Sequence, residues 1–122
     1  MSTQKPFDLK ERTFQFALAV LNWAEKCPRN FMTIEMIRQL IDAGTSVGAN
    51  AEEAEYAQSD RDEAAKLGIA LKETAETHYW IRLFKAKYNV DHGADLLLAE
   101  AEELKKILKS RIRNLRSSDD DP

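Results

Sequence analysis

Apolar residues recur at helical spacing over residues 8–26 and form two separate stripes. Each stripe has members at i, i+4 and i+7, which are Phe14, Leu18 and Leu21 in one and Phe16, Val20 and Trp23 in the other. The spacing predicts a helix that ends before Pro28, because proline disfavours helical backbone at the preceding residue. Two stripes cover more than one side of a helix, and the core of one subunit would bury only one of them. We expect the stripe of Phe16, Val20 and Trp23 to contact another copy of the chain.

Residues 31–58 carry a second helical pattern that continues through a segment rich in small residues. Ile34, Ile37 and Ile41 share one face, and the period continues unbroken through GTSVGANAEEAEYAQS. Each glycine weakens an isolated helix by about 1 kcal/mol relative to alanine, so packing contacts must offset that cost. We predict a helix up to about residue 58 and close packing of a neighbouring helix on its small residues, which are Gly44, Ser46, Gly48 and Ala51.

Two further helices are predicted over residues 60–87 and 92–115, each with an apolar seam in steps of three and four. Ser59 is a candidate N-cap for the first of them, and Asn89 is a candidate for the position just past its end. Short connections between long amphipathic helices favour an antiparallel arrangement. The predicted fold is an all-α, up-down four-helix bundle, and its surplus apolar faces predict a homo-oligomer.

The composition fits a single domain with few, long elements. The chain has 122 residues, of which 43% are hydrophobic and 32% are charged, with only 4 Gly and 3 Pro. Residues 1–116 are expected to form the domain, and the acidic residues 117–122 a disordered tail. One cysteine, Cys27, excludes an internal disulfide, and no apolar run approaches the ~18 residues of a membrane span. We expect a cytoplasmic protein that does not enter a membrane. The net charge of −3 gives no general indication of nucleic-acid binding.

Two glutamates, Glu73 and Glu76, lie on an otherwise apolar face of the third predicted helix. Di-iron bundles place Glu-x-x-His motifs in their cores, but neither histidine of this chain has Glu three residues before it. The residues of a catalytic triad can be far apart in sequence, so the sequence does not exclude a triad, although no motif favours one. A carboxylate metal site in a bundle cavity is the alternative, and it predicts bound metal. We expect no cofactor and no catalysis, and we interpret the polar residues as a buried or interface network of Asn50, Glu53, Glu73, Glu76 and His78.

A basic run without acidic residues occupies the end of the fourth predicted helix. Its members are Lys105, Lys106, Lys109, Arg111, Arg113 and Arg116. One interpretation is a surface that contacts phosphates of RNA or DNA, which an oligomer would multiply. The other is that the helix simply begins acidic and ends basic, as its macrodipole favours. Both interpretations stay open at this point.

The segment GTSVGANAEEAEYAQS followed by IALKETAETHYWIRLF resembles the four-helix-bundle family of 23S ribosomal RNA intervening-sequence proteins. The family pattern is Ser-x-x-x-Asn followed by Glu, and then Lys-Glu-x-x-Glu-Thr-x-Tyr-Trp. Its positions in this chain are Ser46, Asn50, Glu53, Lys72, Glu73, Glu76, Thr77, Tyr79 and Trp80. The resemblance covers roughly Phe7 to Phe84, and Ala54 stands where many members have Gly.

This resemblance implies more about assembly than about activity. Members look like up-down bundles that assemble into barrel-shaped homopentamers, and some are encoded inside insertions in bacterial ribosomal RNA genes. A related accessory protein of diversity-generating retroelements works with a reverse transcriptase and nucleic acid. The resemblance thus implies a homopentamer. The surplus apolar faces, without any catalytic motif, predict a non-enzymatic scaffold or adaptor beside RNA or an RNA-processing protein. The alternative is an RNA- or DNA-binding accessory protein that uses the basic run.

Overall fold

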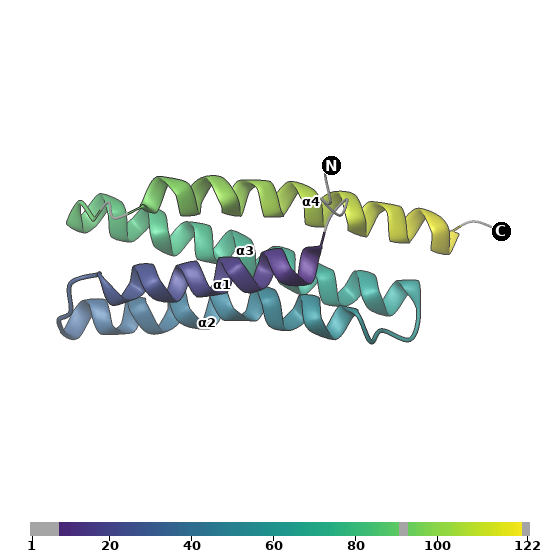
Figure 1. The fold of residues 1–122 in the computed structure, drawn as a ribbon, viewed down its shortest axis with the longest axis horizontal. Helices are drawn as coiled ribbons and strands as arrows, with labels where there is room; N and C mark the ends of the chain where they lie inside the picture. The colour runs from purple at the N-terminus through teal and green to yellow at the C-terminus, as the bar shows by residue number, and fades with distance from the viewer. Residues whose placement is uncertain (1–7, 91–92, 121–122) are drawn as a thin grey trace, which may run out of the picture.

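A computed structural model describes residues 8–90 and 93–120 of the chain. Four helices follow one another: α1 (Leu9–Glu25), α2 (Phe31–Ala54), α3 (Asp60–Tyr88) and α4 (Ala94–Asp120). They run alternately up and down and pack along their lengths (Figure 1). The all-α, up-down four-helix bundle predicted from the sequence is confirmed.

Local side chains fix where the helices begin and end. Asp8 caps α1 by accepting a backbone hydrogen bond in the first turn at 3.1 Å. Asn30 and Thr33 form a reciprocal capping box at the start of α2. Ser59 caps α3, and α3 ends where Asn89 adopts left-handed backbone with a φ of 54°. Short polar residues thus mark where α1, α2 and α3 begin, and Asn89 marks where α3 ends.

Two predicted boundaries differ from the structure. α2 ends at Ala54, short of the predicted end near residue 58, and residues 55–59 form the turn to α3. α4 continues to Asp120, so the helix extends into the segment 117–122 for which a disordered tail is predicted. An established helix adds residues at little cost, even where no packing contact holds them. The predicted start of the last helix at His92 lies outside the described residues.

The stripe formed by Phe16, Val20 and Trp23 faces the interior of the single chain. These side chains are 2%, 0% and 2% exposed, and the Trp23 ring contacts Phe84 of α3 edge-on, with ring centroids 5.9 Å apart. The prediction that this stripe contacts another copy is wrong. The reason is that its two aromatic rings bury large areas, so this face of α1 turns toward the core and the other stripe is left outside.

α1 and α2 approach closely along the small residues of α2. A Cβ atom on Gly44 would lie 2.8 Å from Val20 Cγ1, and one on Gly48 would lie 3.3 Å from the backbone oxygen of Thr13. Ala51, one turn beyond Gly48, is buried. At Gly44 and Gly48 the predicted close packing therefore occurs inside one chain, between α1 and α2, and Ser46 is half-buried.

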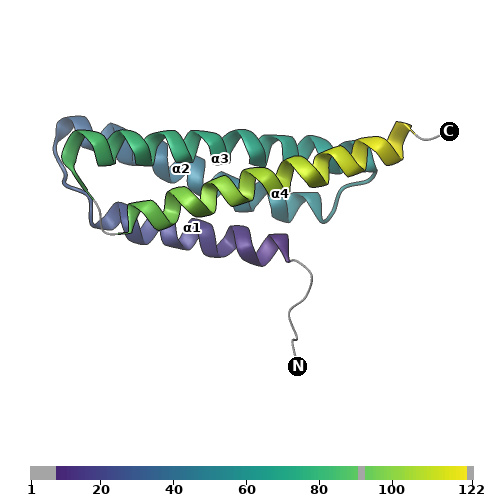
Figure 2. The ribbon, with the colours of Figure 1, turned by 90° about the horizontal axis from the view of Figure 1, so that it is seen from above.

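The bundle has two unlike ends because α1 is short. α1 has 17 residues, whereas α2, α3 and α4 have 24, 29 and 27. One core cluster includes Phe16, Trp23 and Phe84 and is enclosed by all four helices. A second cluster, which includes Leu67 and Leu108, lies toward the end that α2, α3 and α4 form. α4 begins near α1 and diverges from it along its length (Figure 2).

Candidate functional site

The side of α1 that faces away from the core carries its second apolar stripe, which we call the outer stripe. Its members Phe14, Leu18 and Leu21 are 57%, 43% and 37% exposed. Glu25 follows on the same helix face and is also exposed. Scattered single apolar residues are common on protein surfaces, whereas apolar residues that adjoin one another are candidates for a contact surface.

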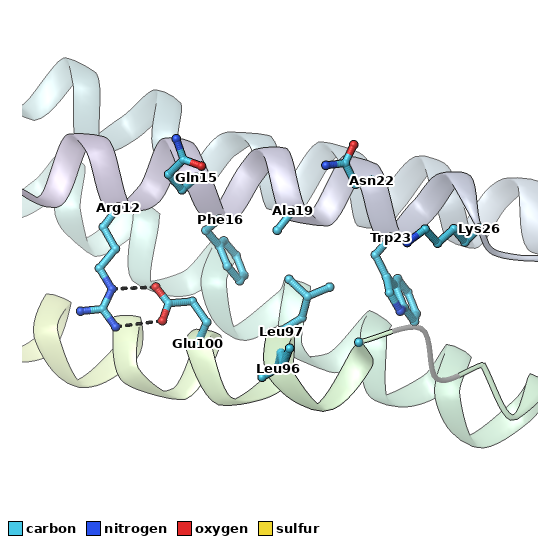
Figure 3. A pocket seen from close by; sticks show the side chains of 11 residues that line it. Arg12, Gln15, Phe16, Ala19, Asn22, Trp23, Lys26, Leu96, Leu97 and Glu100 are labelled. Atoms are coloured by element: carbon cyan, nitrogen blue, oxygen red, sulfur yellow. Dashed lines mark hydrogen bonds and ion pairs between the residues drawn. The ribbon is translucent and has the colours of Figure 1, made fainter.

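A groove of about 460 Å³ opens between α1 and α4, beside the outer stripe (Figure 3). Phe16 and Trp23 point from α1 toward α4, with the small Ala19 between them and Leu97 of α4 opposite. Leu96 lies at the edge of the groove and is 78% exposed. The exposed surface of the groove is thus mostly apolar, and Leu96 on its edge is largely open to solvent.

An ion pair between Arg12 and Glu100 lies at one end of this groove (Figure 3). Arg12 Nε donates to Glu100 Oε2 at 2.6 Å, and Nη2 donates to Oε1 at 2.8 Å. This is the fork geometry of a bidentate pair, and the hydrogen bond to Glu100 raises the pKa of Arg12. The pair joins α1 to α4 where the two helices have begun to separate.

Sequence reasoning misses the groove, although one signal for it is present. Leu96 belongs to the run Leu96–Leu98, and successive helical positions are about 100° apart. Three consecutive leucines therefore cannot all face one core seam, which Leu97 occupies. No local pattern indicates the pairing of Arg12 with Glu100, because these residues are 88 positions apart.

The polar residues expected to form one network occupy separate places. On α2, the Asn50 amide donates to the backbone oxygen of Ser46 at 2.8 Å, within its own helix. Glu53 accepts a hydrogen bond from Lys66 Nζ of α3 at 2.9 Å near the surface. The Asn50 contact is local, because short polar side chains readily bond to nearby backbone groups, whereas the Glu53 contact joins α2 to α3.

Glu73 and Glu76 lie half-buried on α3. Glu76 accepts a hydrogen bond from Trp80 Nε1 at 3.3 Å, one turn further on. Burial raises the pKa of Glu73, the neighbouring Glu76 raises it further, and Lys72 offsets only part of this. The folded chain therefore disfavours the ionised form of Glu73, compared with a glutamate in water.

His78 joins α3 to α4 through a carboxylate. Its Nε2 lies 3.1 Å from Glu102 Oε2. Burial lowers the pKa of His78, and Lys105 and Arg82 lower it further, although Glu102 opposes this. The folded chain therefore disfavours the protonated form of His78, although its imidazole lies beside a carboxylate. Burial also disfavours the charged form of Cys27. It raises the pKa of this thiol to about 11, so the thiol stays protonated.

The basic run of α4 divides between two sides of the helix. Arg111 donates to Glu63 of α3 at 2.8 Å. Four other members follow one another in steps of four, four and three and share a different face. We call them the outer basic row: Lys105, Lys109, Arg113 and Arg116.

Neighbouring acidic residues neutralise part of the basic run. Lys105 lies 3.2 Å from Glu102, and Lys106 lies 3.7 Å from Glu103. Within the part of the chain that the structure describes, the remaining members Lys109, Arg113 and Arg116 have no ion-pair partner. The six predicted contact residues thus reduce to three cations that are open on one face.

Metal clusters and membrane spans can be assessed for the described ranges, 8–90 and 93–120. These ranges contain no group of three or more His, Cys, Asp or Glu side chains that could hold a metal ion. No helix within them combines the length and the apolar character that crossing a membrane requires.

The fold and these surfaces define a class of protein: an up-down four-helix bundle whose distinguishing features are exposed apolar surfaces on α1 and α4. The sequence profile of the 23S rRNA-intervening sequence proteins matches residues 5–110. The chain belongs to this family, as the motifs around Ser46 and Glu73 predict.

A solved structure supports the same assignment. The chain is similar to a protein of unknown function from the S23 ribosomal protein family of Bacteroides thetaiotaomicron VPI-5482, with 35% sequence identity and a TM-score of 0.73. The alignment covers 86% of this chain and 98% of that one. No curated protein gives a significant match.

Proposed function

We propose that this chain is a non-enzymatic protein that assembles as a homopentamer in the cytoplasm and acts as a scaffold or adaptor. The observation that carries the proposal is the outer stripe, because Phe14, Leu18 and Leu21 form an apolar row that their own chain leaves exposed. Covering such a row releases water from apolar surface, which is the main driving force of most protein association. The family resemblance supports five copies as the number.

The outer stripe alone is too small to hold an assembly together. Complete burial of a Leu or Phe side chain contributes about 1.5–3 kcal/mol, and all three residues are already partly covered. Association costs at least about 4 kcal/mol in lost translational and rotational freedom. A stable pentamer therefore requires that the stripe meet a further apolar surface rather than solvent-exposed polar residues.

Light scattering or native mass spectrometry at micromolar concentration tests the assembly. The expected species is about 70 kDa, five times the 13.9 kDa mass of the chain. Leu18→Glu should shift the mass toward that of one chain, because it places a charge in the apolar contact. Tyr56→Glu is the control, since Tyr56 is 80% exposed and lies in the turn after α2. A wild-type chain that runs as a monomer would contradict the proposal.

A second candidate function is RNA or DNA binding through the outer basic row, mainly through its three members other than Lys105, which is paired with Glu102. Lys109, Arg113 and Arg116 share one face of α4 and are open to solvent, and five copies would present this row five times. Multivalent contact raises the apparent affinity well above that of one site. On this proposal the assembly holds an RNA, or an RNA-processing partner together with its RNA, along its outer surface.

Fluorescence anisotropy with a single-stranded RNA at about 50 mM salt tests this second candidate. Lys109→Gln with Arg113→Gln should weaken binding and reduce its dependence on salt, by a log–log slope of about 0.7 per lost contact. Arg111→Gln is the matched control, because it removes a cation from the same helix on the side that faces Glu63. No measurable binding at this salt concentration would exclude the candidate.

A further inference from the structure

We infer that the copies associate head to tail, with the outer stripe of one copy seated in the groove between α1 and α4 of the next. The inference rests on the proposed homo-oligomer and names the two surfaces that meet in it. Such a contact is heterologous, since two different patches of the chain face each other, and repeating it generates a ring or a filament.

The register of α1 supports this pairing. Each residue on the outer face is followed directly by a residue that lines the groove. Phe14, Leu18, Leu21 and Glu25 form the outer face, and Gln15, Ala19, Asn22 and Lys26 line the groove. In a ring whose symmetry axis runs parallel to α1, equivalent residues of all copies lie at the same height. Leu18 of one copy is then level with Ala19 of the next.

The shape of the groove suits a leucine at that height. Ala19 is the smallest side chain of the lining and lies between the larger Phe16 and Trp23 (Figure 3). The space above it can receive Leu18 of the neighbouring copy. Leu96, which is 78% exposed on the opposite edge, is covered by the same contact. The groove thus supplies the additional apolar area that the outer stripe needs.

The charges at the end of α1 fit the same register. Glu25 continues the outer face, and Lys26 ends the groove lining. Both are exposed, and neither has an ion-pair partner among the described residues. Parallel copies place Glu25 of one beside Lys26 of the next, whereas antiparallel copies would place them at opposite ends of the contact. Complementary charges at the rim of an interface fix its register and direction.

The angle between the two surfaces favours a small closed ring. Successive positions on an α-helix differ in direction by about 100°, so the groove-lining residues of α1 face away from the outer stripe but spread over one side of the helix rather than lying directly opposite to it. Each copy in a closed cyclic assembly meets its two neighbours through two different patches set at an angle to each other. A dimer would instead use the same patch twice, and a straight filament would use opposite patches.

Two charge substitutions, one on each surface, test the head-to-tail contact. Leu18→Glu blocks the outer stripe and leaves the groove intact, whereas Leu96→Glu blocks the groove and leaves the stripe intact. Each variant alone should run near the mass of one chain. An equal mixture should contain a species of two chains, one of each variant, because one intact stripe can still meet one intact groove. Tyr56→Glu should retain the wild-type mass.

The alternatives give different results in the same experiment. If wild type assembles and Leu96→Glu assembles equally well, the groove is not the partner surface and the inference is wrong, while the proposed homo-oligomer stands. If both variants are monomeric and their mixture forms no paired species, the inference is also wrong. A monomeric wild type would overturn the homo-oligomer itself.

Cysteine cross-linking measures the register independently of assembly strength. Chains carrying Leu18→Cys and chains carrying Ala19→Cys are mixed, allowed to exchange and then oxidised. The mixture should give disulfide-linked pairs, and either variant alone should give none above the wild-type background. Cys27 is buried, so it contributes little to this background. Equal cross-linking of Leu18→Cys with itself would show a stripe-to-stripe contact and overturn the inference.

Discussion

Phe14 and Phe16 lie two residues apart on the same helix, but only Phe16 is buried. Phe16 is 2% exposed and packs in the core, whereas Phe14 is 57% exposed on the outer face of α1. Both belong to stripes with the same spacing, so the difference does not come from α1 itself. It comes from what lies opposite: Gly44 and Gly48 let α2 approach one side of α1, whereas the outer stripe is left exposed by the three other described helices. Periodicity identifies a surface that can be buried, but only a partner decides whether it is.

Truncation of the two phenylalanines gives the largest expected contrast. Phe16→Ala should lower the free energy of unfolding by about 3–5 kcal/mol, because it leaves a cavity in a packed core. Phe14→Ala should change the stability of the single chain by less than about 0.5 kcal/mol, while weakening self-association. Urea denaturation followed by circular dichroism measures the first effect, and light scattering measures the second. Equal losses of chain stability would contradict the distinction between the two faces.

Two glycines extend the comparison to a covered and an open helix surface. Gly44→Ala should destabilise the chain, since its Cβ would lie 2.8 Å from Val20 Cγ1 and overpacking costs about 1–3 kcal/mol. Val20 is fully buried and β-branched, so it cannot move aside easily. Gly68→Ala should instead stabilise by about 0.5–1 kcal/mol, because nothing lies within 4 Å of its Cβ. Thermal unfolding should show shifts of opposite sign, and the same sign at both sites would refute this account.

The fold follows from the sequence because its signals are local. Helical spacing, the capping residues Asn30 and Ser59 and the stop at Asn89 each act within a few residues, so they predict the helices and their antiparallel order. The ends of α2 and α4 are the exceptions. The unbroken pattern predicts helix to about residue 58 although α2 ends at Ala54, and the polar composition after residue 116 indicates a disordered tail although α4 extends to Asp120.

The interaction surfaces are less accessible to sequence reasoning because they depend on tertiary placement. The two stripes of α1 are visible in the sequence, but the choice between them depends on Trp23 meeting Phe84 across the bundle. The groove requires α4 to diverge from α1, and the paired Arg12 and Glu100 are distant in sequence. The polar motif residues lie on α2 and α3 as predicted, but Asn50 and Glu76 bond within their own helices and Glu53 bonds Lys66, so these contacts do not join them in one network.

The ion pair between Arg12 and Glu100 offers a smaller test of how α1 is held to α4. Arg12→Gln should lower the free energy of unfolding by about 1 kcal/mol, the upper end for a pair that is about one-third exposed but bidentate. Arg38→Gln is the matched control, because Arg38 makes only a single exposed contact with Glu35, at 3.2 Å. The loss at Arg12 should shrink in high salt, which screens exposed charges. A loss at Arg38 as large as that at Arg12 would contradict a specific role for this pair.

On α3 the half-buried Glu73 should make the stability of the chain depend on pH. Burial and Glu76 raise the pKa of Glu73, so the folded chain binds its proton more tightly than the unfolded chain, whose glutamate titrates near 4.5. Protonation of Glu73 therefore stabilises the folded chain. This stabilisation is complete below pH 4.5 and is lost as the pH rises through the pKa of Glu73 in the folded chain. At pH 7, Glu73→Gln should therefore stabilise the chain by about 0.2–0.5 kcal/mol, the size of a like-charge contact one turn apart, and the gain should vanish near pH 4. Urea titrations at both pH values measure this, with the exposed Glu52→Gln on α2 as the control for a lost charge. A gain that is the same at both pH values would mean that ionisation of Glu73 is not its cause.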